Sequence, residues 1–463
     1  MDQFNLVDFF YGPLAFIIIV IFARVKKYRR LETEPEYRYY TKGLYVKLIG
    51  GISLCLVYAL YYGGGDTVNY MHDAVCMLRL LFDNSSGFMS IMNEGVNFGN
   101  AFYLNDQIGY PYYGSDAPSF YVVKVMVPFA LVGAGSFIVT TLLLATISYT
   151  GIWKLYQLYV SEFPELKREM AIAILFIPSV FFWGSGVLKD TITLSCIGYY
   201  TYSFYWIFIK KSYNYKNILA IVIAVYLILK IKPYIVFALL PGSLLWFVNV
   251  NVSNIKNTVV RFLVGPFLFL IAFGGGYLML ASMSNVLGNY ALEKVLEKAT
   301  VTNADLKADY YGGSTFDIGH FDATIPSMLA KAPVAIVAAI FRPYIWEAKN
   351  IVMLISGLES VLLIIFTFRI LWRLRIYGVF PMAVKSPLLT FSLIFSLFFA
   401  FSVGISTSNF GSLVRYRIPV LPFYVASLFI MEYYFKNRKI ELEAEKLIID
   451  EEPLEVKEEK ESA

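Results

Sequence analysis

The chain is poor in charge, histidine and cysteine, and each shortage excludes a class of protein. Only 16% of its 463 residues are Asp, Glu, Lys or Arg, whereas about 25% is usual for a water-soluble domain. Two histidines argue against a histidine-built metal centre, and three scattered cysteines form no disulfide framework. The sequence lacks a P-loop, a G-x-S-x-G serine motif and a basic stripe for nucleic acid.

Apolar residues dominate instead. They make up 58% of the chain, which includes 36 Tyr and 39 Phe. A water-soluble core of this size cannot bury so much apolar surface, so lipid must solvate part of it. We therefore expect an all-α, polytopic transmembrane bundle. The predicted spans are the apolar runs 6–24, 44–63, 136–158, 170–187, 191–209, 217–229, 234–249, 262–283, 350–369, 387–405 and 418–435.

The distribution of Lys and Arg predicts the orientation of these eleven spans. Such residues collect in cytoplasmic loops. The loop after the first span is strongly basic, whereas 64–117 contains one basic residue, Arg79, against six acidic residues. Alternation of the later basic clusters then places the N-terminus outside and the C-terminus inside. The bundle would cover 1–439, followed by a charged cytoplasmic tail over 440–463 that we expect to be disordered.

Two long segments lie outside the membrane in this arrangement, 64–135 and 284–349. Each contains an apolar stretch that is short for a span, 119–134 and 327–341, which we interpret as interfacial or re-entrant helices. Long loops on one face of a bundle are where recognition or chemistry is expected.

Asp66 is the candidate catalytic residue. It follows three glycines at the end of the second predicted span, and a helix over 66–82 would place Tyr70 and Asp73 on the same face. A carboxylate at this boundary can accept a proton from a hydroxyl group. The simpler alternative is that Asp66 only caps that helix. We expect no organic cofactor, while Asp66 and Asp73 leave a shared divalent cation open.

Basic residues gather at the same predicted boundary. Lysine can hold a phosphate as a point charge and arginine can hold it bidentately, and an adjacent aspartate can orient the bound group. Simple interfacial anchoring is the alternative for Lys189 and Asp190. Snorkelling to ordinary lipid phosphates is the alternative for Lys230 and Lys232. The candidate substrate-binding residues are Tyr70, Asp73, Lys189, Asp190, Lys230, Lys232, Arg342, Arg415 and Arg417.

An Asp after an early span, followed by a Tyr and a loop with interfacial helices, resembles the membrane glycosyltransferases of the GT-C class. The F-W-G-S-G-x-x-K-D corner, the K-P-Y link and the R-Y-R-I-P-x-x-P end are also similar to multi-span proteins of bacterial surface-polysaccharide synthesis, including repeat-unit polymerases. The resemblance implies that Asp66 matches the catalytic acid of the class. Here Asp66 follows the second span, and Thr67 stands where many relatives carry a second acid.

The resemblance further implies that Lys189, Lys230, Lys232 and Arg415 or Arg417 bind a lipid phosphate. The predicted function is transfer of a sugar from a polyprenyl-phosphate-linked donor to an acceptor on the outer face of the bacterial cytoplasmic membrane. The alternatives are a repeat-unit polysaccharide polymerase and, ranked lower, a lipid or solute transporter. The expected partners are the lipid-linked sugar and membrane lipid, and not nucleic acid.

Overall fold

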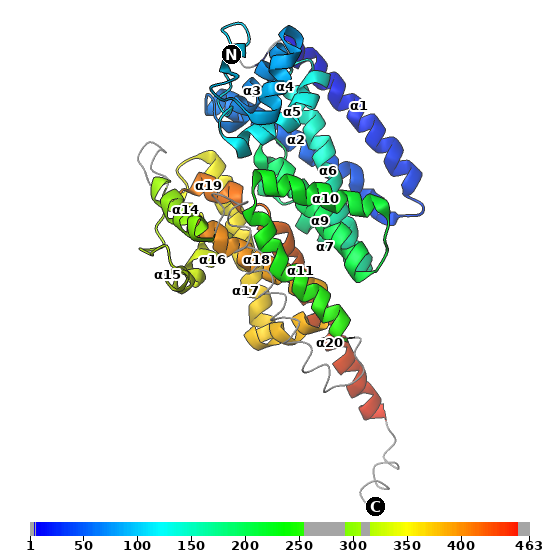
Figure 1. The fold of residues 1–463 in the computed structure, drawn as a ribbon. Helices are drawn as coiled ribbons and strands as arrows, with labels where there is room; N and C mark the ends of the chain where they lie inside the picture. The colour runs from blue at the N-terminus through cyan, green and yellow to red at the C-terminus, as the bar shows by residue number, and fades with distance from the viewer. Residues whose placement is uncertain (1–3, 5, 254–291, 307–314, 452–463) are drawn as a thin grey trace, which may run out of the picture.

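The structure, a computed structural model, describes residues 4, 6–253, 292–306 and 315–451. Within these ranges it is helical and contains no strand, apart from an isolated bridge between Thr315 and Asn409 (Figure 1). The predicted all-α class is therefore confirmed for the described part of the chain. The predicted span 262–283 lies outside the described residues.

Six of the described helices are long and apolar enough to cross a membrane. A seventh is added if the pair α19 (Phe410–Tyr416) and α20 (Val420–Glu451), bent by 61°, forms one broken span. Helices able to span a membrane are thus present, while the number eleven and the orientation stay predictions. The six are α1 (Leu6–Arg30), α2 (Tyr40–Leu56) with its flanking turns, α6 (Phe137–Glu162), α11 (Tyr234–Ser253), the first part of α17 (Ile351–Lys385) and α18 (Pro387–Ser406).

Interrupted and short helices account for much of the difference between the eleven predicted spans and the six or seven candidate spans of the structure. The apolar run 170–187 is divided between α7 (Lys167–Leu175) and α8 (Pro178–Trp183), because proline has no N–H to continue the preceding helix. The next two helices, α9 (Lys189–Phe204) and α10 (Tyr215–Ile231), have 16 and 17 residues. They are shorter than the roughly 20 residues that cross a bilayer without help.

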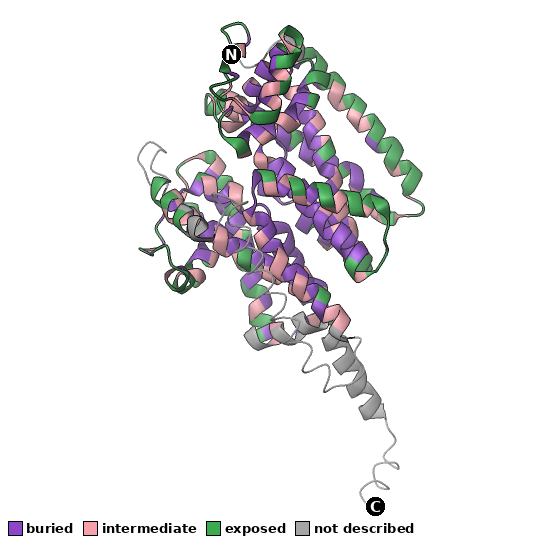
Figure 2. Ribbon diagram, in the orientation of Figure 1, coloured by how far each residue is buried: buried purple, intermediate pink, exposed green. Residues whose placement is uncertain are grey.

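The outward faces of several helices are apolar. α1 lies along the edge of the molecule against α2 and α6, and most of its outer face is exposed (Figures 1 and 2). Phe10 and Phe22 on that face are 74% and 72% exposed. Water-soluble monomers rarely expose continuous apolar surface of this kind, so these faces are those of a membrane protein.

The long predicted external segments are helical as well. The first contains α3 (Asp66–Asp83), α4 (Ser85–Glu94) and α5 (Ala117–Val132), and α5 covers the short apolar stretch 119–134. The second contains α14 (Leu292–Asp305), α15 (Ile325–Ala330) and α16 (Ala332–Phe341). The short helices are present where the sequence predicted them, and their place at a membrane surface stays a prediction.

The first half of the chain is built on the contact between α6 and α9. Two glycines at this contact, Gly151 and Gly198, leave no room for a side chain. A Cβ atom on Gly151 would lie 2.2 Å from the carbonyl oxygen of Ser195, and one on Gly198 would lie 2.2 Å from the carbonyl oxygen of Gly151. The two backbones therefore touch. This contact fixes α9, and α10 packs against its other side.

The second half of the chain packs around α18, which contacts α11, α16 and α20. Aromatic rings fill this contact, with Phe395 packing edge-on against Phe423 at 4.7 Å between ring centroids. α20 continues to Glu451 and so extends helix into the predicted tail, while 452–463 lie outside the described residues.

Candidate functional site

Arg415 is the centre of a network of charged side chains. Its Nε donates to Oδ2 of Asp190 at 2.7 Å, and its Nη1 pairs with Oδ2 of Asp66. The ammonium of Lys232 lies 2.6 Å from the other oxygen of Asp190 and 4.7 Å from the centre of the Tyr416 ring. The structure thus brings four predicted site residues, from four distant segments, into direct contact.

Each of these residues lies at the end of a helix. Asp66 begins α3 after a turn in which the glycines 63–65 all have positive φ, a conformation that glycine adopts without steric cost. Asp190 lies in the first turn of α9, and Lys232 follows directly after α10. Arg415 occupies the last turn of α19. Helix ends leave side chains free to converge, which long helices packed side by side do not.

The start of α19 is capped by Asn409. Its side-chain oxygen accepts the N–H groups of Gly411 and Ser412 at 2.9 and 3.3 Å. This capping satisfies groups that a helix otherwise leaves without partners. It also fixes the short helix that presents Arg415.

The two carboxylates that hold Arg415 differ in exposure. The side chain of Asp190 is 1% exposed, whereas that of Asp66 is 41% exposed. Arg415 and Lys232 are 11% and 9% exposed. Asp190 is therefore the buried anchor of both cations, and Asp66 is the partner that a ligand from solvent can replace.

Tyr113 adds a second contact to Asp66. Its hydroxyl donates to Oδ1 of Asp66 at 2.8 Å. Burial alone would raise the pKa of Asp66, but attraction to Arg415 and the hydrogen bonds from Arg415 and Tyr113 outweigh it, so this pKa lies below its usual value. Burial, and then the nearby negative charge of Asp66, raise the pKa of Tyr113 and keep its proton in place. Asp66 is thus ionised and is a weak base while it remains paired.

Tyr70 and Asp73 support Tyr113 and do not face Arg415. Asp73 is fully buried, and its two oxygens accept the backbone N–H groups of Tyr112 and Tyr113, each at 2.8 Å. The ring of Tyr70 packs on that of Tyr113 with 4.6 Å between centroids. Since both oxygens of Asp73 are engaged in this way, it is not poised to share a divalent ion with Asp66.

Lys189 lies at the edge of the network. Its ammonium is 3.8 Å from Oδ2 of Asp116, and the two side chains are 21% and 55% exposed. With Asp116 included, the carboxylates of residues 66, 116 and 190 equal in number the cations of residues 189, 232 and 415. The network is therefore balanced in charge among the described residues.

Three predicted phosphate-binding residues lie outside the network. Lys230 lies 5.9 Å from the centre of the Tyr226 ring. Arg342 pairs with Glu347, to which its Nε donates at 3.1 and 3.2 Å. Arg417 is turned away from Arg415 and is fully buried.

Arg417 holds four segments of the chain together. Its Nη1 donates to the carbonyl oxygens of Ile340 and Arg342 at 3.1 and 2.6 Å, and its Nη2 lies 3.3 Å from Glu359. Glu359 in turn accepts the backbone N–H and the hydroxyl of Ser179 at 2.8 and 2.7 Å. The role of Arg417 is therefore structural in the described part of the chain.

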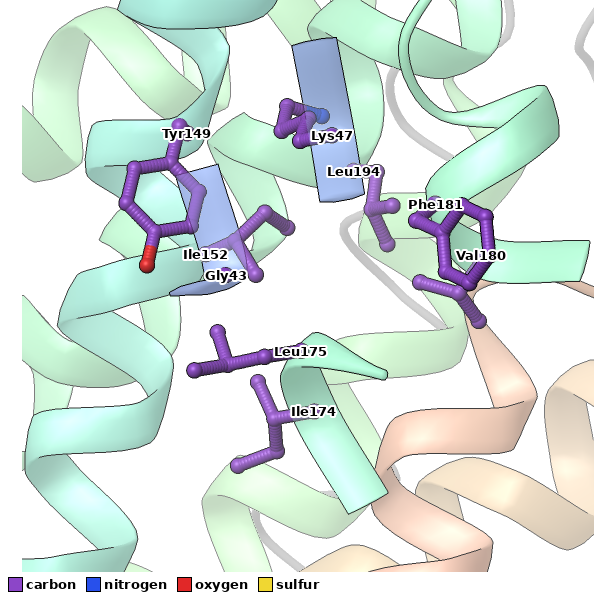
Figure 3. A pocket seen from close by; sticks show the side chains of 9 residues that line it. All are labelled: Gly43, Lys47, Tyr149, Ile152, Ile174, Leu175, Val180, Phe181 and Leu194. Carbon is purple, nitrogen blue, oxygen red and sulfur yellow. The ribbon is translucent and has the colours of Figure 1, made fainter. Parts of the chain in front are cut away.

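Lys47 is a buried cation inside the predicted span 44–63. It lies within α2, is 5% exposed and donates to the carbonyl oxygen of Gly184. It lines a cavity of about 10 Å³ with Tyr149 and Leu194 (Figure 3), which is at the lower limit for one water molecule.

Tyr113 and Asp116 were also missed by sequence reasoning. Both lie in the predicted external segment 64–135, and only the fold places them beside Asp66 and Lys189. Asp116 does carry a local signal, because it precedes Ala117-Pro118 and caps α5 by accepting the N–H of Ser119 at 3.2 Å.

No protein-family model, curated protein or solved structure matches this chain. Among the described residues, no group of three or more His, Cys, Asp or Glu side chains is placed to hold a metal ion. The chemistry of the network around Arg415 is therefore the basis on which a function can be assigned.

Proposed function

We propose that the chain is a GT-C-like glycosyltransferase of the bacterial cytoplasmic membrane. It transfers a sugar from a polyprenyl-phosphate-linked donor to an acceptor on the outer face, in synthesis of a surface polysaccharide or glycoconjugate. The observation that carries the proposal is Arg415 held between a buried carboxylate, Asp190, and an accessible one, Asp66. The eleven-span, N-out arrangement belongs to the proposal, because it places this network at the outer boundary.

The balanced charge of the network determines how a phosphate enters. With cations and carboxylates equal in number, the site attracts an anion only if the anion replaces a carboxylate. Asp190 is buried and keeps its hold on Arg415 and Lys232, whereas Asp66 is accessible. The donor phosphate therefore takes the place of Asp66 at Nη1 of Arg415, where a guanidinium forms charge-assisted hydrogen bonds.

Displacement of Asp66 also activates it. Without Arg415 the pKa of this carboxylate rises toward its usual value, and Asp66 can accept the proton of the acceptor hydroxyl. The acceptor oxygen bonds to the anomeric carbon as the bond from that carbon to the phosphate oxygen breaks. Arg415, Lys189 and Lys232 stabilise the negative charge that develops on the departing polyprenyl phosphate.

The test uses membranes that contain the chain and radiolabelled polyprenyl-phosphate sugars as donors. Asp66→Asn should reduce transfer by about 10²-fold or more, the usual contribution of a general base, with little change in melting temperature because Asp66 is partly exposed. Asp106→Asn is the matched control, because Asp106 is an exposed acid of the same segment. Normal transfer by Asp66→Asn would overturn the assignment.

The products that accumulate in a strain lacking this protein distinguish sugar transfer from polymerisation. A transferase leaves the acceptor without its sugar. Accumulation of single lipid-linked repeat units would indicate a polysaccharide polymerase. The same residues would then bind phosphate in an enzyme that holds two carrier lipids in one groove.

A further inference from the structure

A hollow of about 390 Å³ lies at the end of α9 and α10 opposite to the network. It is lined by Lys154 of α6, by Tyr202 and Ser203 of α9, by Trp206 just beyond α9, and by Lys216 at the start of α10. The 16 residues of α9 span about 24 Å, close to the thickness of a hydrocarbon core of about 30 Å. The hollow and the network therefore lie at opposite ends of α9, and in the eleven-span arrangement they lie near opposite boundaries of the membrane.

Two buried polar atoms at this hollow lack a hydrogen bond of normal geometry. Ser203 is fully buried and its hydroxyl has no partner, and the buried indole nitrogen of Trp206 has none of normal geometry, although it interacts with the nearby hydroxyl of Tyr202. Buried polar groups are normally hydrogen-bonded, and each exception needs an explanation. Because an indole N–H can only donate, the partner that is missing here is an acceptor.

Positive charge surrounds the same space. The ammonium of Lys154 lies 4.4 Å from the centre of the Tyr202 ring and has no ion pair with a carboxylate among the described residues. α10 begins at the hollow, where Asn214 caps it by accepting the N–H of Lys216 at 3.0 Å, and a helix N-terminus favours negative charge. The missing acceptor is therefore an anion.

An apolar surface continues from the hollow along α10. Ile218, Leu219 and Val222 are 43%, 57% and 58% exposed, and they lie within the two turns that follow Lys216. A soluble anion would make no use of this surface, whereas an acyl chain would cover it. The occupant thus has a charged head and an apolar tail.

We propose that this hollow binds the phosphate headgroup of an anionic phospholipid whose acyl chains lie along α10. Lys154 and the first turn of α10 attract the phosphate, and Ser203 and Trp206 donate to its oxygens. This site is separate from the network around Arg415 and does not depend on the proposed sugar transfer.

Native mass spectrometry of the purified full chain tests the proposal, with phosphatidylglycerol and phosphatidylcholine as probes. Wild type should retain phosphatidylglycerol, and Lys154→Gln should weaken this retention about tenfold, as expected for loss of one charge-assisted contact. Lys124→Gln is the control, because Lys124 also lies over aromatic rings but belongs to α5. Trp206→Phe removes the N–H together with one ring of the indole, should weaken retention about threefold, and keeps the test decisive if Lys154→Gln fails to fold.

Three results would overturn the proposal. One is equal retention of phosphatidylglycerol by wild type, Lys154→Gln and Trp206→Phe. The second is equal retention of phosphatidylcholine and phosphatidylglycerol by wild type. The third is displacement of the lipid by inorganic phosphate at the same concentration, which would assign the hollow to a soluble anion.

Discussion

Asp66 uses one carboxylate oxygen for Arg415 and the other for the hydroxyl of Tyr113. Both contacts favour the ionised form of the acid, so each contributes to the pH range in which it can act as a base. Arg415 leaves Asp66 when a phosphate binds in our mechanism, but Tyr113 has no reason to leave. Tyr113 is therefore a positioning residue whose contribution persists during the reaction.

Tyr113→Phe should shift the acid limb of the pH–rate profile to higher pH. The hydrogen bond from Tyr113 lowers the pKa of Asp66, so its loss raises that pKa, and the ionised base is then lost at a higher pH. The measurement is sugar transfer between about pH 4 and pH 8, around the usual pKa of Asp. Tyr112→Phe is the control, since the ring of Tyr112 packs against His72. An unshifted acid limb in Tyr113→Phe would show that Tyr113 does not act on Asp66 during the reaction.

His72 should make stability depend on pH. Its hydrogen bond to Asp73, at 3.2 Å, raises the pKa of His72 from 6.5 to about 9. A raised pKa gives a contribution that is fully present below pH 6.5 and is lost as the pH rises through about 9. The melting temperature of His72→Gln should thus lie below that of wild type at pH 6 and match it near pH 10.

The other histidine of the chain gives the control for this measurement. His320 is 91% exposed beside an exposed Asp322, so His320→Gln should change the melting temperature little at any pH. A difference between His72→Gln and wild type that persists unchanged to pH 10 would contradict the argument.

Sequence could indicate Asp66, Asp190, Lys232 and Arg415 because each lies where an apolar run ends, and charges at such places need partners. Arg417 shows the limit of that argument. Two residues apart on a helix are about 200° apart around its axis, so Arg415 and Arg417 could not both face one ligand. Nothing local indicated Tyr113, which reaches Asp66 only through the fold of a segment 47 residues away.

At the scale of helices, the structure depends on a buried ion pair that joins α8, α16, α17 and the bend before α20. Arg417 donates to two backbone carbonyl oxygens there as well as to Glu359. The pair is deeply buried, with exposures of 0% and 7%. Removal of one partner from such a pair leaves an uncompensated charge.

Arg417→Ala should lower the free energy of unfolding by about 3–5 kcal/mol, the usual cost of breaking a buried pair. Thermal unfolding in detergent would measure the change. Arg373→Ala, which removes a 43% exposed partner of Glu432, should cost about 0–1 kcal/mol. Equal losses in the two variants would show that Arg417 does not hold the segments together.

The elements themselves were only partly predictable. Within the described residues the apolar runs coincide with helices, because a run of apolar side chains can be read directly from the sequence, and the short helices α5 and α16 appear where expected. The run 170–187 was taken as one span although Pro178 lies inside it, and the structure breaks the helix just before that proline. Hydrophobicity alone does not distinguish a crossing helix from two short ones packed inside the bundle.

For the whole molecule, the number of crossings determines which groups face which side. Eleven and seven spans both place the two ends of the bundle on opposite sides, so labelling of the termini cannot separate them. Labelling of positions inside the chain tests the orientation that both counts share. Residues 106 and 211 are both exposed, and both counts place 106 outside and 211 inside.

Asp106→Cys should react with a membrane-impermeant maleimide in intact cells, and Lys211→Cys only after permeabilisation. The background should be low because all three native cysteines, Cys55, Cys76 and Cys196, are buried. Reaction of both introduced thiols from the same side would contradict the proposed arrangement. Protection of Asp106→Cys in intact cells would remove the network from the outer face.

The backbone contact between α6 and α9 has a consequence for genetics. Gly198 is eight residues from Asp190, about 12 Å along α9, yet a methyl group at Gly151 or Gly198 would have to push α9 away from α6. Such a push would carry Lys189 and Asp190 with it. A random screen for loss of function should therefore recover alanine and serine at these two glycines, and these mutants would be mistaken for lesions in the reaction centre.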